Sequence, residues 1–495
     1  MTQHKFIEYY SWKNNTVISM LLFLAIQLVV LISPNIIVAA SFDDFNNEKI
    51  DSNKWAVQEF VRVVEDEMLS MAGSHRTDKN EHNQVETLFK NPELITKLQA
   101  TITVGAYQLD PDITTEWNQM VAAELSGSYY GSANGDVDAG ISIIDTNGGE
   151  GLKAWCYASS QDDVFEVNHK FTMSIETGHP YILAIEYKEA DQKFTCSIED
   201  GNNPATKENK DLDVSSTPSS GRPGREKKAL RVWYTIDGET DGTFDAEISL
   251  AAIIDDIETQ EGPYDDFTSN TLSSSKWNSV ESVRRITDNS LELSQRSEGI
   301  PFQTTRILTA DTVRSTDYYQ VSIRVDSASY RNGATTAVNT GMSGFFYNDI
   351  AEGGNQNMVG DHLAMVAFRL SPENSLEAEA TIFRCGNADC SDAVANRVWS
   401  QEFTTKPLFN TQQTVSIKNT GNSLIFDMEG EQIVHSITET FSPFSSIRML
   451  ETLVWSNGSE DGNMVVFFDN VIFEEQTSPW SLFLPAILTS PKSNE

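Results

Sequence analysis

The sequence predicts an all-β protein: two tandem antiparallel β-sandwich (jelly-roll) domains that follow a signal peptide. Three observations predict it: a segment that occurs twice about 220 residues apart, many short stretches rich in β-branched and aromatic residues, and an apolar run near the N-terminus. With 495 residues, the chain is also long for one hydrophobic core, which favours two or three domains.

The N-terminal region has the pattern of a secretory signal peptide. Residues 17–32 are apolar almost throughout, a polar turn ends the run, and small residues at 38–40 offer a cleavage site. We therefore assign 1–40 to a signal peptide and expect a secreted, periplasmic or cell-surface protein. An uncleaved signal anchor is the alternative, because the run is nearly long enough to cross a bilayer. It would be the only expected membrane contact.

A sequence repeat organises the rest of the chain. The stretch FDDFNNEKIDSNKW, which ends at Trp55, aligns without gaps to YDDFTSNTLSSSKW, which ends at Trp277. Matches return near the ends of the two copies, at Trp233 and Trp455. A period of this length is that of a domain rather than of a solenoid repeat.

The repeat also places the domain boundaries. We expect the first domain at 41–260 and the second at 263–476, separated by a short linker rich in turn residues. The C-terminal tail, 477–495, carries an apolar patch, PWSLFLPAIL, which is too short to span a bilayer. It is similar to tails on some exported bacterial proteins and would be a sorting or docking segment, or else pack on the second domain.

Both copies have the local pattern of β-strands, and long helical periodicity is absent. Strand-turn-strand hairpins are expected over 182–201 and 414–433. The stretch 202–228, rich in Pro, Gly, Ser and mixed charges, is expected to be a disordered loop. Further strands are expected at 318–325, 363–370 and 463–473.

The four cysteines form two pairs. Cys156 and Cys196 lie in strand-like contexts, whereas Cys385 and Cys390 flank a short turn. An even number of cysteines after a signal peptide predicts disulfides in an oxidising compartment. Loop closure would contribute about 4 kcal/mol for the first pair and about 2 kcal/mol for the second.

The opening stretch FDDF…W, the central hairpin ending in Asp/Glu-Gly and the final strand FFDNV together resemble the concanavalin A-like lectin/glucanase superfamily, which includes laminin-G-like modules. The resemblance spans both copies. It implies a curved sheet whose concave face is the family's usual carbohydrate platform, and first and last strands that lie side by side in each domain. The acidic residues expected to meet are then Asp43 and Asp44 with Asp255 and Asp256, and Asp265 and Asp266 with Asp469.

The catalytic motif of the laminarinase-like members, Glu-x-Asp-x-Glu on one strand, is absent from the sequence. The nearest runs, at 189–193 and 239–243, lack the final acid, and no other familiar catalytic motif occurs. We therefore expect a non-catalytic, exported binding or adhesion protein, with polysaccharide or glycoconjugate as the candidate ligand. A divergent glycoside hydrolase or polysaccharide lyase is one alternative, and a structural envelope or matrix protein is another.

A sugar-binding face needs aromatic side chains and a few fixed polar groups. The four tryptophans that recur in both copies, at 55, 233, 277 and 455, fit core packing better than ligand binding. The formal net charge of -37 makes nucleic acid an unsuitable partner. The candidate ligand-binding residues are Trp117, Tyr129, Tyr130, Trp155, Tyr157 and Trp399.

Calcium is the candidate cofactor, in a structural role, because carboxylate and carbonyl oxygens are its preferred ligands. Two Asp/Asn-Gly-x-x-Asp-Gly turns and the acidic pairs at the ends of each copy offer such oxygens. The alternative is plain polar turns, since Asp, Asn and Gly are common turn formers. The candidate ligands are Asp237, Asp241, Asn457 and Asp461 in the turns, and Asp43, Asp44, Asp255, Asp265, Asp266 and Asp469 at the ends.

Overall fold

The computed structural model describes residues 41–77, 81–111, 113, 118–129, 136–147, 149–160, 165–214, 227–236, 246–298, 303–310, 316–330, 337–346, 358–387, 390, 396–438, 447–455 and 461–475. The predicted signal peptide and C-terminal tail lie outside these residues. Strands make up 70% of the structure and helix 2%, and the sheets are antiparallel, so the all-β sandwich prediction is confirmed. Among the described residues, no helix has the length and apolar character needed to cross a bilayer.

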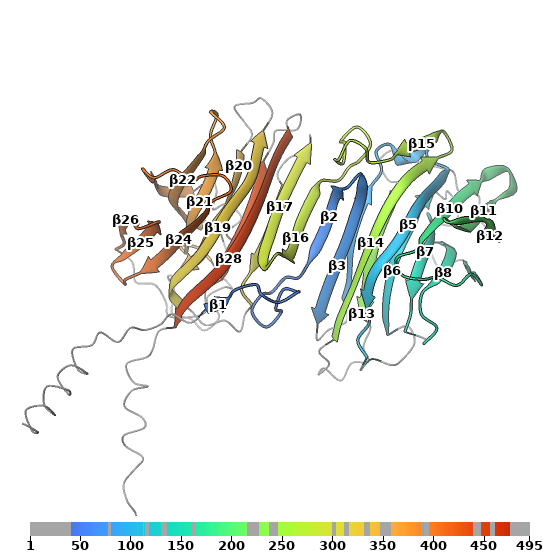
Figure 1. Ribbon diagram of the computed structural model, residues 1–495, viewed down its shortest axis with the longest axis horizontal. Coiled ribbons are helices and arrows are strands. Elements are labelled where there is room, and N and C mark those ends of the chain that lie inside the picture. The colour runs from blue at the N-terminus through green and yellow to red at the C-terminus, as the bar shows by residue number, and fades with distance from the viewer. Residues whose placement is uncertain are drawn as a thin grey trace, which may run out of the picture. The chain divides into compact units, whose positions relative to one another are not determined.

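The described strands form three sheets (Figure 1). The large sheet runs in the order β12 (Asn203–Asp213), β11 (Lys193–Asp200), β10 (Pro180–Lys188), β5 (Lys97–Gln108), β14 (Ala246–Thr259), β3 (Met68–Thr77), β2 (Phe60–Glu65), β16 (Glu281–Thr287), β17 (Ser290–Glu298), β28 (Asp461–Glu475), β19 (Thr316–Tyr330), β24 (Gln412–Asn419), β25 (Ser423–Met428) and β26 (Glu431–Ser436). Two short strands join it from the side: β1 (Ser41–Asp43) pairs with β28, and β15 (Gly262–Asp265) pairs with β14.

The other two sheets have six strands each. The first runs β4 (Glu81–Leu88), β13 (Lys228–Ile236), β6 (Gln119–Tyr129), β7 (Val137–Asp145), β8 (Lys153–Ser160) and β9 (Glu166–Lys170). The second runs β18 (Gln303–Leu308), β27 (Arg448–Trp455), β20 (Ala337–Phe346), β21 (His362–Leu370), β22 (Leu376–Arg384) and β23 (Arg397–Glu402). Two 3₁₀ turns, η1 (Pro92–Leu94) and η2 (Glu189–Asp191), complete the elements.

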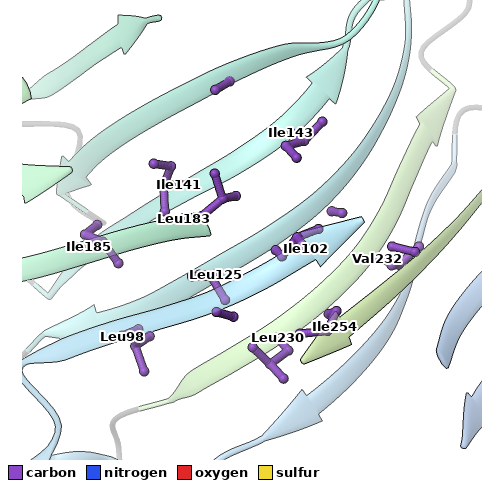
Figure 2. Close-up of a cluster of buried hydrophobic side chains, with 14 of the residues drawn as sticks. Leu98, Ile102, Leu125, Ile141, Ile143, Leu183, Ile185, Leu230, Val232 and Ile254 are labelled. Carbon is purple, nitrogen blue, oxygen red and sulfur yellow. The ribbon is translucent and has the colours of Figure 1, made fainter. Parts of the chain in front are cut away.

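Each six-stranded sheet packs against strands of the large sheet and encloses a hydrophobic core. The first core joins β4 to β8 and β13 with β3, β5, β10, β11 and β14. Figure 2 shows Leu98 and Ile102 of β5 gathered there with Leu125 of β6 and Leu230 of β13. Alternate residues of each strand face this core, as the period of two in a β-strand requires. The second core joins the second six-stranded sheet with β17, β19, β24, β25 and β28 in the same way.

The two opening segments of the sequence repeat, 41–55 and 263–277, are exchanged between the cores. The first pairs with the final strand of the second core: Asp43 lies opposite Val471. The second pairs with β14 of the first core: Asp265 lies opposite Ile257. The expected approach of Asp43 and Asp44 to Asp255 is therefore wrong, as is that of Asp265 and Asp266 to Asp469.

Pairing between β2 and β16 explains the exchange. Phe60, the first residue of β2, lies opposite Arg284 of β16, so the chain that precedes β2 is already beside the second core. The amide of Ala56 accordingly donates to the carbonyl of Leu308 at 2.8 Å. On the other side, the amide of Asn278 donates to the carbonyl of Leu88 at 2.8 Å. Each opening segment thus crosses the pairing of β2 with β16. The segment 41–55 of the first copy closes the second core, and the segment 263–277 of the second copy closes the first core.

An Asp–Trp hydrogen bond anchors each opening segment. The indole Nε1 of Trp55 donates to Oδ2 of Asp43 at 2.6 Å, and Asp43 Oδ1 accepts the amide of Phe45 at 3.1 Å. Asp43 is only 3% exposed and Trp55 1%, so this carboxylate is a buried acceptor that needs its donors. The second segment repeats the arrangement, with Trp277 Nε1 donating to Asp265 Oδ2 at 2.6 Å.

Two arginines hold the junction between β2 and β16. Arg62 Nε donates to the carbonyl of Val280 at 2.6 Å, and Arg284 donates to the carbonyl of Gln58. These residues occupy the same place in the two copies of the repeat, so each guanidinium reaches across to the other copy. Burial lowers the pKa of Arg62 to about 10 and that of Arg284 to about 10. The junction is therefore a partly buried, hydrogen-bonded contact between the two copies.

Both predicted disulfides are present. Cys156 of β8 and Cys196 of β11 join the two layers of the first sandwich through its core, with Cα atoms 6.4 Å apart. Cys385 and Cys390 close the turn after β22, with Cα atoms 4.7 Å apart. Free cysteines are absent from the described residues.

The prediction of a disordered loop over 202–228 is wrong for its first half. Residues 203–213 form β12, which pairs with β11 at the edge of the large sheet. Nine of its eleven residues are exposed and five are charged, and charged side chains are one way in which proteins protect a sheet edge from pairing with other chains. An edge strand and a disordered loop can have the same polar, charged composition, so composition alone wrongly predicted disorder here. The predicted hairpins and the strands of 318–325, 363–370 and 463–473 are confirmed.

The exchange predicts which core each tryptophan stabilises. Trp55→Ala should cost about 3–5 kcal/mol and speed amide hydrogen exchange in β19 and β28, while β5 and β14 stay protected. Trp277→Ala should do the reverse, because its side chain lies in the first core. Each variant is the matched control for the other. Loss of protection in β5 or β14 on Trp55→Ala would contradict the exchanged arrangement.

A carboxyl group beside the junction makes stability pH-dependent. Burial raises the pKa of Glu59, against hydrogen bonds from Ser74 and the amide of Ile286 that lower it. When the pKa of a carboxyl group is higher in the folded than in the unfolded protein, the protonated group favours the folded state. This contribution to stability is complete below the pKa of the unfolded protein, near 4.5, and is lost as pH rises through the pKa of the folded protein. Glu59→Gln should therefore melt like the wild type at pH 4 and at a higher temperature at pH 7. An equal difference in melting temperature at both pH values would oppose this.

Candidate functional site

The outer face of the first six-stranded sheet, turned away from the first core, carries a group of polar and aromatic side chains. On β13, Val232 and Tyr234 point into the core, so Arg231 and Trp233 lie on the outer face. On β6, Glu124 lies between two buried apolar residues and shares this face. Antiparallel pairing places Arg231 directly opposite Glu124.

Glu124 is the centre of this group. Its side chain is only 2% exposed, although it lies on the outer face. Oε1 accepts a hydrogen bond from the Tyr157 hydroxyl at 3.2 Å, and Oε2 accepts one from the Trp233 indole at 3.0 Å. The carboxylate therefore fixes two aromatic side chains from different strands, β8 and β13. A buried carboxylate without such donors would be strongly destabilising.

A guanidinium links Glu124 to a second carboxylate. Arg231 Nε donates to Oε2 of Glu86 at 2.7 Å, and its NH1 lies 3.8 Å from Oε1 of Glu124. Burial alone would lower the pKa of Arg231, but Glu124 and Glu86 outweigh it and the pKa is raised. We call Glu86, Glu124, Tyr157, Arg231 and Trp233 the Glu124 cluster.

The Tyr157 ring covers a glycine beside the cluster. Its ring lies against Gly140 of β7, where an added Cβ would come within 2.8 Å of it. Ser126 of β6, opposite Gly140, is 3% exposed, and its hydroxyl has no hydrogen-bond partner. Burial, and then the charge of Glu124, raises the pKa of the Tyr157 hydroxyl. Tyr157 therefore stays protonated at neutral pH and acts as a donor.

The edge of the cluster extends to β4. The ring of His82 lies 5.7 Å from that of Trp233, and its Nδ1 is within hydrogen-bond distance of the Thr235 hydroxyl, at 2.7 Å. Burial, and then Arg231, lowers the pKa of His82. The imidazole is thus neutral at pH 7 and adds aromatic surface rather than charge.

The second six-stranded sheet lacks the cluster. The carbonyls of Lys228 and Arg448 accept equivalent amide hydrogen bonds, from Phe89 at 3.0 Å and Thr309 at 2.9 Å, which aligns the two sheets. From these anchors, the two charges are reversed in order: Glu451 stands in the place of Arg231, and Arg306 in the place of Glu86. By the same count, the places of Glu124, Tyr157 and Trp233 are taken by Gly341, Thr381 and Leu453.

The predicted ligand-binding residues lie in different parts of the structure, and only some of them are on the outer face of the first six-stranded sheet. Tyr157 belongs to the cluster, and Trp155 lies on the same face of β8. Tyr129 is fully buried in the first core, where the Lys228 ammonium lies 3.8 Å from its ring centroid, so the prediction that it meets a ligand is corrected. Trp399 packs against Phe426 of the second core. Trp117 and Tyr130 lie outside the described residues.

Sequence reasoning missed four members of the cluster and misplaced one of them. Trp233 and Trp455 were expected in the cores, yet Trp233 lies on the outer face and Trp455 is 42% exposed. The alternation in KALRVWYTI carries the signal, because it puts Arg231 and Trp233 on the face opposite Val232. The core prediction holds for Trp55 and Trp277.

Calcium stays a prediction. Among the described residues, no three His, Cys, Asp or Glu side chains gather as a metal site requires. Asp469 of β28 accepts the amide of Asn470 at 2.7 Å, and Asp255 of β14 that of Asp256 at 2.8 Å, so each acid bonds the next residue at a local irregularity of its strand. Asp44 and Asp266 accept the amides of Asn46 and Thr268. Asp461 begins β28, whereas Asp237, Asp241 and Asn457 lie outside the described residues.

Comparison with known proteins found no matching family model and no matching curated protein. Among solved structures, the chain is similar to the carbohydrate binding module CBM66 from Bacillus subtilis, with 14% identity and a TM-score of 0.21 over 37% of this chain and 86% of the module. It is also similar to a laminarinase from Flavobacterium sp. UMI-01, with 9% identity and a TM-score of 0.27 over 39% of this chain and 81% of that one.

The LG1-3 region of the laminin alpha2 chain is a third similar structure, with 9% identity and a TM-score of 0.21 over 81% of this chain and 65% of that one. A likeness at this level carries no functional argument. The proposal below therefore rests on the Glu124 cluster.

Proposed function

We propose that the protein is an exported polysaccharide-binding protein and that the Glu124 cluster binds the glycan without cleaving it. The observation that carries the proposal is a buried carboxylate on the outer face of a sheet that holds a tyrosine and a tryptophan from two strands. Protein sites for sugars combine aromatic surface with a few fixed polar groups. The two disulfides fit the oxidising compartment of an exported protein.

The cluster offers complementary groups to a sugar. Trp233, Tyr157 and the nearby His82 supply aromatic surface for the apolar faces of sugar rings. The Ser126 hydroxyl beside Tyr157 has no partner and can bind a sugar hydroxyl once the ring moves. Glu124 itself is buried and holds Tyr157 and Trp233 in place.

The same contacts argue against hydrolysis. A glycosidase needs one carboxyl group that is protonated and free to reach the leaving-group oxygen. Both oxygens of Glu124 already accept hydrogen bonds, from Tyr157 and Trp233. Glu86 is engaged by Arg231 at 2.7 Å. Neither acid is placed to give a proton to a bound glycan.

Replacing one aromatic side chain tests the proposal. Trp233→Ala should weaken binding to a soluble polysaccharide about tenfold or more, because it removes both a stacking surface and a donor to Glu124. Trp455→Ala is the matched control: its indole is exposed on the second six-stranded sheet and should be dispensable. Affinity electrophoresis across a polysaccharide panel gives the measurement.

Absence of retention on every polymer, for a wild type that melts cooperatively, would refute polysaccharide binding. Equal losses of binding affinity for Trp233→Ala and Trp455→Ala would show that the Glu124 cluster is not the binding site. Release of reducing ends or of unsaturated sugars by the wild type would show catalysis and overturn the non-catalytic part.

A further inference from the structure

We infer that the Glu124 cluster selects uncharged glycans and rejects polyuronates and sulfated polymers. This inference rests on the proposed function and names the ligand class of the same site. Its basis is the charge arrangement on the outer face of the first six-stranded sheet, where the cation of the cluster is already matched by two anions of the protein.

Arg231 has no charge to spare for a ligand. Its Nε is occupied by Glu86 at 2.7 Å, and its NH1 faces Glu124 at 3.8 Å. The side chains of Glu86 and Glu124 are 15% and 3% exposed, so both carboxylates are held close to the guanidinium with little water. A ligand carboxylate would have to displace one of them and then lie beside it as a like charge.

The other described charges on this face do not offset that arrangement. Lys170 of β9 forms an ion pair with Glu150. Lys153 lies on the same face of β8 as Tyr157, and its charge also acts on Glu150, whose pKa Lys170 and then Lys153 lower. Asp138 of β7 accepts a hydrogen bond from Ser128 at 2.6 Å and adds a further negative charge near β6. His82 is neutral at pH 7, because burial and Arg231 lower its pKa.

Long-range charge acts in the same direction. The chain carries a formal net charge of -37, which slows the approach of any polyanion at low ionic strength. An uncharged glycan meets no such barrier. Its ring faces can pack on Trp233, and a hydroxyl group can bind the Ser126 hydroxyl once the Tyr157 ring moves. Specificity thus comes from a repulsive element as well as from attractive contacts.

A single substitution should change the ligand class. Glu86→Gln keeps the size of the side chain but releases the Nε edge of Arg231 from its stronger ion pair. We expect this variant to gain about tenfold in affinity for alginate and polygalacturonate at low ionic strength. Glu377→Gln is the matched control, because it removes a carboxylate paired with Arg369 on the second six-stranded sheet.

The measurements are affinity electrophoresis and calorimetry on the full mature chain, with melting curves to confirm folding. The wild type should bind a neutral polymer equally well at low and physiological ionic strength, and this test does not depend on any variant. Retention of the wild type on alginate or polygalacturonate alone would overturn the inference and leave polysaccharide binding intact. A Glu86→Gln variant that folds but gains nothing on the acidic polymers, or gains no more than Glu377→Gln, would also overturn it. No retention on any polymer would refute the proposed function itself.

Discussion

The hydrogen bond between an aspartate and a tryptophan in each opening segment is the interaction on which the architecture depends. Asp43 holds Trp55 and Asp265 holds Trp277, both at 2.6 Å and both inside a core. The opening segment of the first copy lies in the second core, and that of the second copy lies in the first core. Neither core is therefore complete without a segment from the other copy. The hydrogen bonds of Arg62 and Arg284 at the junction then fix the direction in which each segment leaves. Each core therefore includes side chains from both copies.

This frame also positions the candidate site. The second opening segment pairs with β14, which lies in the layer beneath β13 and β6. A rigid lower layer lets the first six-stranded sheet keep its register, and register alone puts Arg231 opposite both Glu86 and Glu124. The disulfide between Cys156 and Cys196 ties the layers together one residue before Tyr157. The cluster is thus built on strands rather than loops, and its parts have little freedom to drift.

Much of this structure could be read from the sequence. Alternating apolar residues and the repeat were sufficient for the strands, the sandwich class and the disulfides. The exchange could not be read, because FDDF…W fits either core equally well and local sequence does not state which partner it meets. The cluster was missed for a related reason: Glu124 lies among alanine and serine on a strand of weak pattern. Trp233 was matched to Trp455, whereas the hydrogen-bonded register pairs its place with Leu453.

The exchanged strand β1 has a consequence for how the molecule is made. Ser41 finds its partner, Ile472, about 430 residues further along the chain. A ribosome delivers β1 first and β28 last, so the opening segment must wait, with Phe45 and Trp55 exposed, until nearly the whole polypeptide has emerged. Such a distant closure is slow. The second core therefore closes last, and Phe45 and Trp55 stay in water until β28 has been made.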